Sequence, residues 1–443
     1  MECRRYEDGA ILIADSPPFK LMSSEIGTML GHRPSPNSGR HGGHSLSASY
    51  FSHSPTEPAP LTIGSMLTPF SEPRAAYVHV PFCAHRCGYC DFTLVAGRDD
   101  LIEDYLRAIE RELAILEVPR PVETLFFGGG TPTHLGPEQL ERLFCIVGKW
   151  LPVCDGSEVN VEANPAGLSD EKIDVLVEAG VNRVSLGVQS FSASLLEVLE
   201  RDHREADIVS AVERLQCRIS NVGLDLIFAV PGQTLANCRD TLERATTLRP
   251  DHISTYGLTW EKGTTYWSRR AKGELAPAAE ELERTMYELA MDRLPELGWR
   301  QYELSNFAHP GRECRHNEVF WQGLPYYGFG PGAASYIKGT RRTNHRSVTT
   351  WLQRVLAAES GVGDSETLGR VERAREAVML GLRRTAGIDR HVFRERFDVD
   401  VDELAGPAIA RFVAGGLLED DGTSLRLTRE GRCVADTVMA EFL

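Results

Sequence analysis

Three cysteines lie close together in one short segment, Cys83-Ala-His-Arg-Cys87-Gly-Tyr-Cys90. The segment directly follows an apolar run that predicts a β-strand, so the thiols stand on a loop at the end of that strand. Thiolates at this spacing can bind three irons of a four-iron cubane cluster and leave the fourth iron open. A cluster with four cysteine ligands only transfers electrons, whereas an open iron can also bind a small molecule. The spacing therefore predicts a catalytic type of [4Fe-4S] cluster.

A zinc site is the alternative use of these thiols, with His79 or His85 as the fourth ligand. Zinc usually favours paired Cys-x-x-Cys units, and the chain has no second unit of that kind. The other seven of the ten cysteines are scattered along the chain. Scattered single thiols are typical of a protein from a reducing compartment.

Glycine and polar residues follow the apolar runs further along the chain. Gly128, Gly129 and Gly130 precede Thr131, and such a run would let the backbone approach a ligand closely and offer amide donors. Later runs end near Glu162, Gln189, Asp225 and Tyr256. In a barrel of parallel strands the carboxyl ends of the strands share one rim, where binding sites are built. We therefore expect these residues to line one site.

Six apolar runs alternate with amphipathic stretches, which is the pattern of parallel strands joined by crossover helices. The expected strands are 75–82, 122–130, 157–165, 182–190, 222–232 and 252–260. The expected helices are 100–117, 137–151, 169–180, 205–217 and 234–248, and Ser169 and Gly180 should cap the third of them. The fold class is therefore α/β, with a partial (β/α)6 TIM-like barrel.

The pattern divides the chain into four parts. Residues 1–73 are rich in Ser, Pro, Gly and His without apolar periodicity, which predicts a disordered extension. Residues 74–262 form the barrel core. Residues 263–364 extend it, with a long helix near 280–294 and a glycine- and aromatic-rich lid over the barrel mouth. Residues 365–443 read as helices around a short hairpin, which predicts a mostly helical, winged-helix-like domain.

The cysteine motif, with Tyr77-Val-His-Val-Pro-Phe82 before it, resembles the radical S-adenosylmethionine superfamily, and more narrowly its HemN/HemW branch. The likeness runs from about residue 75 to the carboxyl end and includes FFGGGTPT, VEANP, RVSLGVQSF, LDLIFAVPGQT, YELSNFA and CRHN. It implies a [4Fe-4S] cluster on the three cysteines and S-adenosylmethionine beside it. By this resemblance, the methionine end of S-adenosylmethionine is held by Gly129, Gly130 and Thr131, and its amino group by Glu162. The ribose and the carboxylate are held by Gln189, Arg201 and Asp225, and Tyr77 lies near the cluster.

Two segments bear on whether the chain resembles the chaperones or the enzymes of this branch, and each departs from one of the two patterns. HemN-type enzymes carry a further cysteine two positions after the triad, where this chain has Phe92. The segment His316-Asn-Glu-Val-Phe320-Trp321 resembles a His-Asn-x-x-Tyr-Trp signature of HemW-type haem chaperones, with Phe320 in the tyrosine place. His316 is the expected axial haem ligand. The flat apolar surface for the macrocycle would come from Trp321, Tyr326, Tyr327 and Phe329, and the cations for its propionates from Arg341, Arg342 and Arg346.

Three functions follow from the resemblance, and no residue is assigned as catalytic. The first is a HemW-like chaperone that binds haem and delivers it to acceptor proteins. The second is an oxygen-independent coproporphyrinogen III dehydrogenase, which uses a 5'-deoxyadenosyl radical to decarboxylate propionates. The third is a HemN-like radical methyltransferase that uses a second S-adenosylmethionine.

The net charge and the hydropathy of the chain limit the kinds of partner that it can have. The formal net charge of −15 disfavours nucleic acid as a partner. No apolar run approaches the roughly 20 residues that span a bilayer, so we expect a cytoplasmic protein. The implied partners are haem or a porphyrin, haem-accepting proteins and an electron donor to the cluster. A homodimer and a peripheral membrane contact stay open.

Overall fold

The computed structural model describes residues 72–443, so nearly all of the predicted disordered extension lies outside the described residues. A nine-stranded sheet forms the centre of the molecule, in the order β11-β1-β4-β5-β6-β7-β8-β10-β9. Its six central strands are parallel and are β1 (Ala75–Val80), β4 (Val122–Gly129), β5 (Val153–Ala163), β6 (Arg183–Gln189), β7 (Asn221–Phe228) and β8 (His252–Gly257). All six strands predicted from the apolar runs are thereby confirmed.

The edges of this sheet leave the barrel open. Strand β11 (Tyr327–Phe329) pairs parallel with β1, while β10 (Asn306–Ala308) and β9 (Arg300–Gln301) continue antiparallel from β8. Within residues 72–443, β9 and β11 do not pair with each other. The fold is therefore a partial barrel, as predicted.

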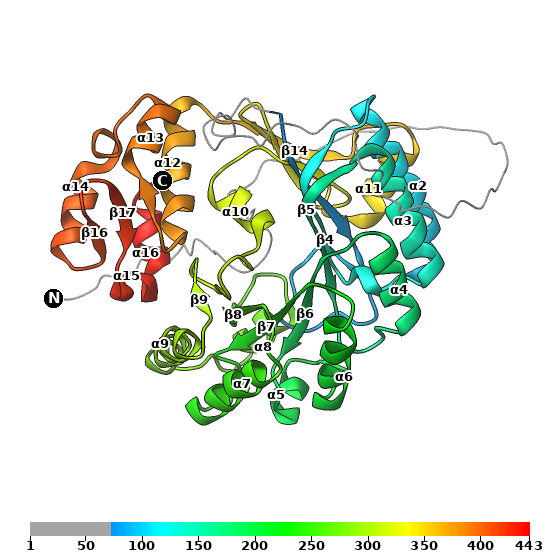
Figure 1. Ribbon diagram of the computed structural model, residues 1–443, viewed down its shortest axis with the longest axis horizontal. Coiled ribbons are helices and arrows are strands. Elements are labelled where there is room, and N and C mark those ends of the chain that lie inside the picture. Colours follow the sequence, from blue (N-terminus) through cyan, green and yellow to red (C-terminus); the bar gives the residue numbers. More distant parts are fainter. Residues whose placement is uncertain (1–71) are drawn as a thin grey trace.

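Amphipathic helices cover the outer face of the sheet, and Figure 1 shows them along the convex side. They are α2 (Ile102–Leu113), α3 (Pro137–Trp150), α4 (Asp170–Glu178), α6 (Glu205–Gln216), α7 (Leu235–Thr247) and α9 (Glu280–Glu296). The short helices α5 (Ala193–Val198) and α8 (Thr265–Ala271) belong to a separate apolar cluster beside the cysteine loop, where Tyr266 N donates to Gly88 O. The predicted caps of α4 are confirmed. Ser169 Oγ accepts a hydrogen bond from Lys172 N, and Gly180 has a φ of 75° in the turn that ends the helix.

The segment after the barrel forms a second, antiparallel sheet. Its strands are β12 (Ala334–Ile337), β13 (Thr340–Asn344) and β14 (Val362–Thr367), with α11 (Val348–Leu356) beside them. The buried carboxylate of Glu112 on α2 ties it to the barrel, because it accepts hydrogen bonds from Gly330 N at 2.7 Å and Asn344 Nδ2 at 2.6 Å. Helix α10 (Arg315–Trp321) lies between the sheet and the C-terminal helices (Figure 1).

The carboxyl-terminal part has a hydrophobic core of its own. It contains α12 (Arg370–Arg383), β15 (Ile388–Asp389), α13 (Arg390–Phe397), α14 (Val401–Ala414), β16 (Leu418–Asp420), β17 (Ser424–Leu427), α15 (Arg429–Cys433) and α16 (Ala435–Ala440). This order of helices around the β16–β17 hairpin is the predicted winged-helix-like arrangement. The boundaries at 263 and 365 stay predictions.

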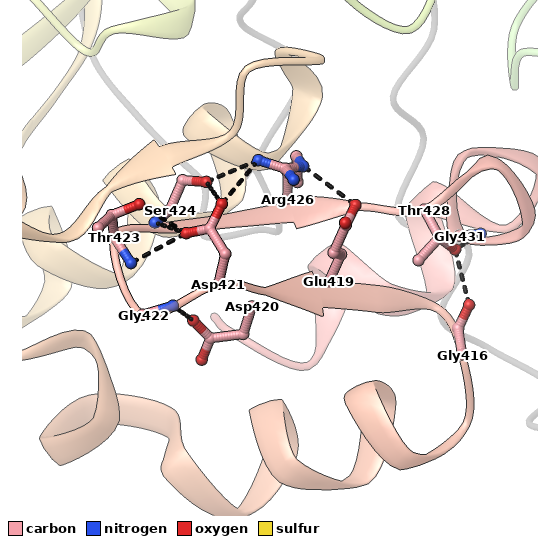
Figure 2. A network of polar contacts seen from close by, with 10 residues as sticks. All are labelled: Gly416, Glu419, Asp420, Asp421, Gly422, Thr423, Ser424, Arg426, Thr428 and Gly431. Carbon is pink, nitrogen blue, oxygen red and sulfur yellow. Dashed lines mark hydrogen bonds and ion pairs between the residues drawn. The ribbon is translucent and has the colours of Figure 1, made fainter.

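Acidic side chains fix the tip of the β16–β17 hairpin (Figure 2). Asp421 Oδ1 accepts hydrogen bonds from the backbone N–H groups of Thr423 at 2.9 Å and Ser424 at 2.7 Å. Arg426 forms ion pairs with Asp421 and Glu419, both at 3.1 Å. The charge of Arg426 is thus neutralised, whereas a hairpin that binds nucleic acid would present unpaired cations to phosphates. Among residues 72–443, no helix is long and apolar enough to cross a bilayer.

Candidate functional site

One cavity of about 320 Å³ joins the carboxyl ends of the parallel strands to α10 and α12. A volume of about 300–1,000 Å³ is usual for a small-molecule site. The three cysteines, the predicted axial ligand His316 and every predicted S-adenosylmethionine residue except Gly129 line this cavity, namely Tyr77, Cys83, Cys87, Cys90, Gly130, Thr131, Glu162, Gln189, Arg201, Asp225 and His316. Sequence segments almost 240 positions apart thus meet at one site.

The three cysteines stand on the loop that begins at β2 (Phe82–Cys83), and all of them are free thiols. The loop turns at a hydrogen bond from Cys90 N to Cys87 O of 3.0 Å. Cys83 Sγ lies 3.2 Å from Thr131 Oγ1. Burial raises the pKa of Cys83 to about 12 and that of Cys90 to about 11. Both thiols therefore hold their protons at neutral pH, and binding of iron would release them.

The geometry disfavours the zinc alternative. His79 already uses both ring nitrogens, with Nδ1 3.1 Å from Tyr77 Oη and Nε2 2.6 Å from Thr93 O. His85 is exposed and lies beside Glu200 at 3.5 Å. In the described part of the chain, no three His, Cys, Asp or Glu side chains converge on a position for one metal ion. A cubane cluster needs no such convergence, because each cysteine binds a different iron.

The glycine turn at the end of β4, Gly128–Thr131, differs from what the sequence predicted. Its amide groups were expected to donate to a ligand, but they already donate within the protein. Gly129 N bonds to Glu162 Oε2 at 2.9 Å, Gly130 N to Val80 O at 2.8 Å and Thr131 N to Phe82 O at 2.7 Å. A Cβ on Gly129 would lie 2.5 Å from the His79 ring, and a Cβ on Gly130 would lie 2.6 Å from Phe82 O. The glycines are therefore required for close packing of β4 against β1 and β2.

The groups that line the cavity include two buried carboxyl groups, of Glu162 and Asp225, and the guanidinium of Arg201. Burial, with a smaller contribution from the charge of Asp225, raises the pKa of Glu162 to about 8. Burial likewise raises the pKa of Asp225, which accepts hydrogen bonds from Ser185 Oγ at 2.9 Å. Arg201 Nη1 lies 3.8 Å from Cys87 Sγ, so a positive charge stands beside the cysteine loop. These groups can pair with an ammonium, with hydroxyls and with a carboxylate.

Several cavity residues were not predicted. Asn164 links two predicted residues, because its Oδ1 accepts from Arg201 Nη2 at 2.5 Å and its Nδ2 donates to Thr131 Oγ1 at 3.1 Å. It follows β5 directly, so the search for polar residues at strand ends could have found it. Arg183 and His252 also line the cavity. They are the first residues of β6 and β8, and the amino ends of strands carry no comparable signal.

His316 lies on the cavity wall in the first turn of α10 and is 1% exposed. Its Nδ1 is 2.9 Å from Thr124 Oγ1, and its Nε2 has no hydrogen-bond partner among the described residues. Burial lowers the pKa of His316 to about 3, so the imidazole is neutral. When Nδ1–H donates to the Thr124 hydroxyl, the lone pair of Nε2 is free, which is the form that binds iron. Phe320 packs edge-on against this ring, with the centroids 4.9 Å apart.

The predicted macrocycle surface is wrong for three of its four aromatic residues. Trp321 lines the cavity, but Tyr326, Tyr327 and Phe329 are 2%, 8% and 6% exposed and lie outside the lining. Tyr327 and Phe329 belong to β11 and extend the central sheet beside β1. The aromatic region thus serves as sheet and core more than as a lid.

The predicted propionate cations are also wrong, since Arg341, Arg342 and Arg346 do not line the cavity. Arg341 is buried and paired with Glu366 and Glu376, which neutralise its charge. Arg346 Nη2 donates to Asp91 O at 2.9 Å and lies outside the lining. The guanidinium groups that do line the cavity are those of Arg183, Arg201 and Arg383.

Family models and similar whole proteins both relate this chain to known proteins. Residues 77–245 match the radical SAM superfamily, and residues 368–434 match the HemN C-terminal domain. The heme chaperone HemW of Bacillus subtilis is 38% identical over 377 residues, which cover 84% of this chain and 99% of that protein. The mitochondrial radical S-adenosyl methionine domain-containing protein 1 of Danio rerio is 32% identical, with 83% of this chain and 86% of that protein covered.

A solved structure supports the fold independently. Coproporphyrinogen III oxidase HemN from Escherichia coli superposes with a TM-score of 0.75 over 84% of this chain and 90% of that chain, at 23% identity. At this identity the likeness establishes the fold alone. The identity to full-length relatives goes further, and the chain therefore belongs to the HemW family of radical S-adenosylmethionine proteins.

Proposed function

We propose that this protein is a haem chaperone that binds haem in the described cavity and delivers it to acceptor proteins. The observation that carries the proposal is His316, a buried and neutral imidazole on the cavity wall whose Nε2 has no partner among the described residues. A neutral imidazole with a free nitrogen is a common ligand of haem iron. The name of the Bacillus subtilis relative, a heme chaperone, supports the same function.

We further propose that Cys83, Cys87 and Cys90 hold a [4Fe-4S] cluster beside bound S-adenosylmethionine. The three free thiols on one cavity-lining loop fit such a cluster. Bound together, cluster and nucleoside can supply one-electron cleavage to a carbon radical. The protein contributes the pocket, in which Arg201 suits the carboxylate of the ligand and Glu162 its ammonium.

The Gly128–Thr131 turn would contact the methionine end in a particular way. Since its amides at Gly129, Gly130 and Thr131 are engaged within the protein, the contact would use carbonyl oxygens and the Thr131 hydroxyl. Tyr77, Gln189 and Asp225 complete the proposed lining of this subsite. An electron donor to the cluster and a haem acceptor are the proposed protein partners.

The haem test compares purified full-length protein with its His316→Ala variant, titrated with ferric haem. We expect the variant to bind at least about tenfold more weakly, a change of about 1.4 kcal/mol, and to lose the absorption bands of an imidazole-ligated iron. His391→Ala is the control, because His391 is exposed on α13. Unchanged affinity and spectrum would reject His316 as the ligand.

A second experiment separates the chaperone from an enzyme. Cluster-reconstituted protein is incubated anaerobically with reductant, S-adenosylmethionine and coproporphyrinogen III, and the products are identified by mass spectrometry. We expect intact coproporphyrinogen, because Phe92 lines the cavity where HemN-type enzymes carry a cysteine. Decarboxylated porphyrin together with 5'-deoxyadenosine would overturn the chaperone assignment.

A further inference from the structure

The C-terminal part supplies one wall of the cavity. Met379, Leu380 and Arg383 lie on one side of the last turns of α12, and all three line the cavity. Helix α12 packs beside α10, which carries His316 and Trp321 (Figure 1). The cavity end that contains the His316 imidazole is therefore closed by a different part of the chain from the end that contains the cysteines.

Arg383 is unusual for an arginine at a helix end, because it is only 6% exposed. Its guanidinium lies over the Trp321 ring, 4.3 Å from the ring centroid. Among the described residues, only its Nη2 has an acceptor, Glu303 Oε2 at 3.1 Å. Its Nε–H is buried and has no acceptor among residues 72–443.

The Nε1–H group of Trp321 is likewise buried and has no acceptor in the described part of the chain. Two N–H donors thus remain unsatisfied at one stacked contact on the cavity wall. A buried donor without an acceptor is unfavourable, and an acceptor on a molecule bound in the cavity would satisfy both of these donors. Next to a guanidinium, the acceptor that fits best is a carboxylate.

The Glu303 carboxylate does not depend on Arg383 alone. Its Oε1 accepts hydrogen bonds from Ser305 N at 2.8 Å and from Asn306 Nδ2 at 2.6 Å. Glu303 is therefore held in place by residues two and three positions after it in the sequence, and Arg383 can share its donors with a second carboxylate. Met379, Leu380 and Phe320 supply apolar lining at the same end of the cavity. An apolar ring system that carries carboxylates matches this combination.

We propose that Arg383 and Trp321 form a carboxylate-binding subsite for a propionate of the bound haem, which makes α12 part of the haem site. The inference rests on the proposed haem binding. It assigns to the C-terminal domain a direct role in recognising the cargo. It also replaces the propionate cations expected from the sequence, which lie outside the cavity.

The test compares two probes, ferric haem and ferric haem dimethyl ester, in which both propionates are esterified and uncharged. Dissociation constants are measured by absorption titration for the full-length wild type and for Arg383→Met. We expect the wild type to prefer free haem by about tenfold or more, as a charge-assisted pair requires, and Arg383→Met to lose that preference. Trp321→Phe keeps a ring but removes the N–H, and should lose part of the preference.

The matched control is Arg370→Met, which changes the same residue type at the exposed start of α12, away from the cavity. It should keep the wild-type preference. Because Arg383→Met leaves Glu303 buried without its cation, the pair Glu303→Gln/Arg383→Met repeats the measurement without a buried charge. The double variant should also bind haem and its ester equally.

The outcomes separate this inference from the proposed function. Wild-type protein that binds haem and the ester with equal affinity, with His316 still required, overturns the subsite alone. If Arg383→Met weakens the binding of both probes by the same factor, the subsite is also overturned, because that is the effect of a damaged cavity. Wild-type protein that binds neither probe overturns both the subsite and the proposed haem binding.

Discussion

Glu158 should control the position of the haem-ligand candidate. This carboxylate on β5 is 8% exposed and sits at the start of α10. Its two oxygens accept the backbone N–H groups of Arg315 and His316, each at 3.0 Å. Because α10 has only seven residues, these two bonds are a large share of what fixes its first turn.

The expected magnitude follows from those bonds. A hydrogen bond to a charged group contributes about 1.5–3 kcal/mol, so the loss of both bonds in Glu158→Ala should lower the local stability of α10 by about 3–6 kcal/mol. A loss of about 3 kcal/mol corresponds to roughly 100-fold faster hydrogen exchange of the amides at 315–321. Haem affinity should fall with it, since His316 is no longer held in the cavity wall.

The assay is hydrogen–deuterium exchange read by mass spectrometry on peptides that cover α10. Glu103→Ala is the matched control, because Glu103 forms an exposed ion pair with Arg142 at 2.6 Å. Such a surface pair contributes about 0–1 kcal/mol, so α10 should exchange at the wild-type rate. Exchange of α10 in Glu158→Ala within about threefold of wild type would refute the reasoning.

Three further predictions concern the rim of the barrel. Gly129→Ala places a Cβ 2.5 Å from the His79 ring at a φ of +111° and should lower the free energy of unfolding by several kcal/mol in urea titration. Gly167→Ala, at a φ of +77° with no atom within 4 Å, should cost only about 1–2 kcal/mol, and equal losses would contradict the packing argument.

Because the pKa of Glu162 is raised to about 8, the folded state holds a proton that the unfolded state releases. This bound proton stabilises the folded state, and the stabilisation is lost as pH rises from about 4.5 to 8. The free energy of unfolding in urea should therefore fall less between pH 5 and pH 8 in Glu162→Gln than in the wild type. Equal losses in both proteins would refute this. Cys87→Ala should lose the brown cluster absorbance while its far-ultraviolet circular dichroism is unchanged, and full iron and sulfide content would reject the ligand.

The sequence by itself determined the sheet and the cysteine loop. Alternation of apolar runs and amphipathic stretches is a local property, since each strand must bury both faces and each helix one face. Carboxyl ends of parallel strands meet at one rim whatever the details of packing, so Glu162, Gln189 and Asp225 could be assigned to one site before the fold was known. The close spacing of Cys83, Cys87 and Cys90 is likewise local.

Only the tertiary structure decided which groups remain available at that site. The amides of Gly129, Gly130 and Thr131 donate to Glu162 and to neighbouring strands, and Tyr327 and Phe329 belong to a strand of the central sheet. Pairing between distant segments engages these groups, and the sequence alone does not show it. Arg383 became a cavity residue through the packing of α12 beside α10, although an arginine at a helix end is usually solvated. Burial and partner choice depend on contacts between distant segments, and no local pattern encodes them.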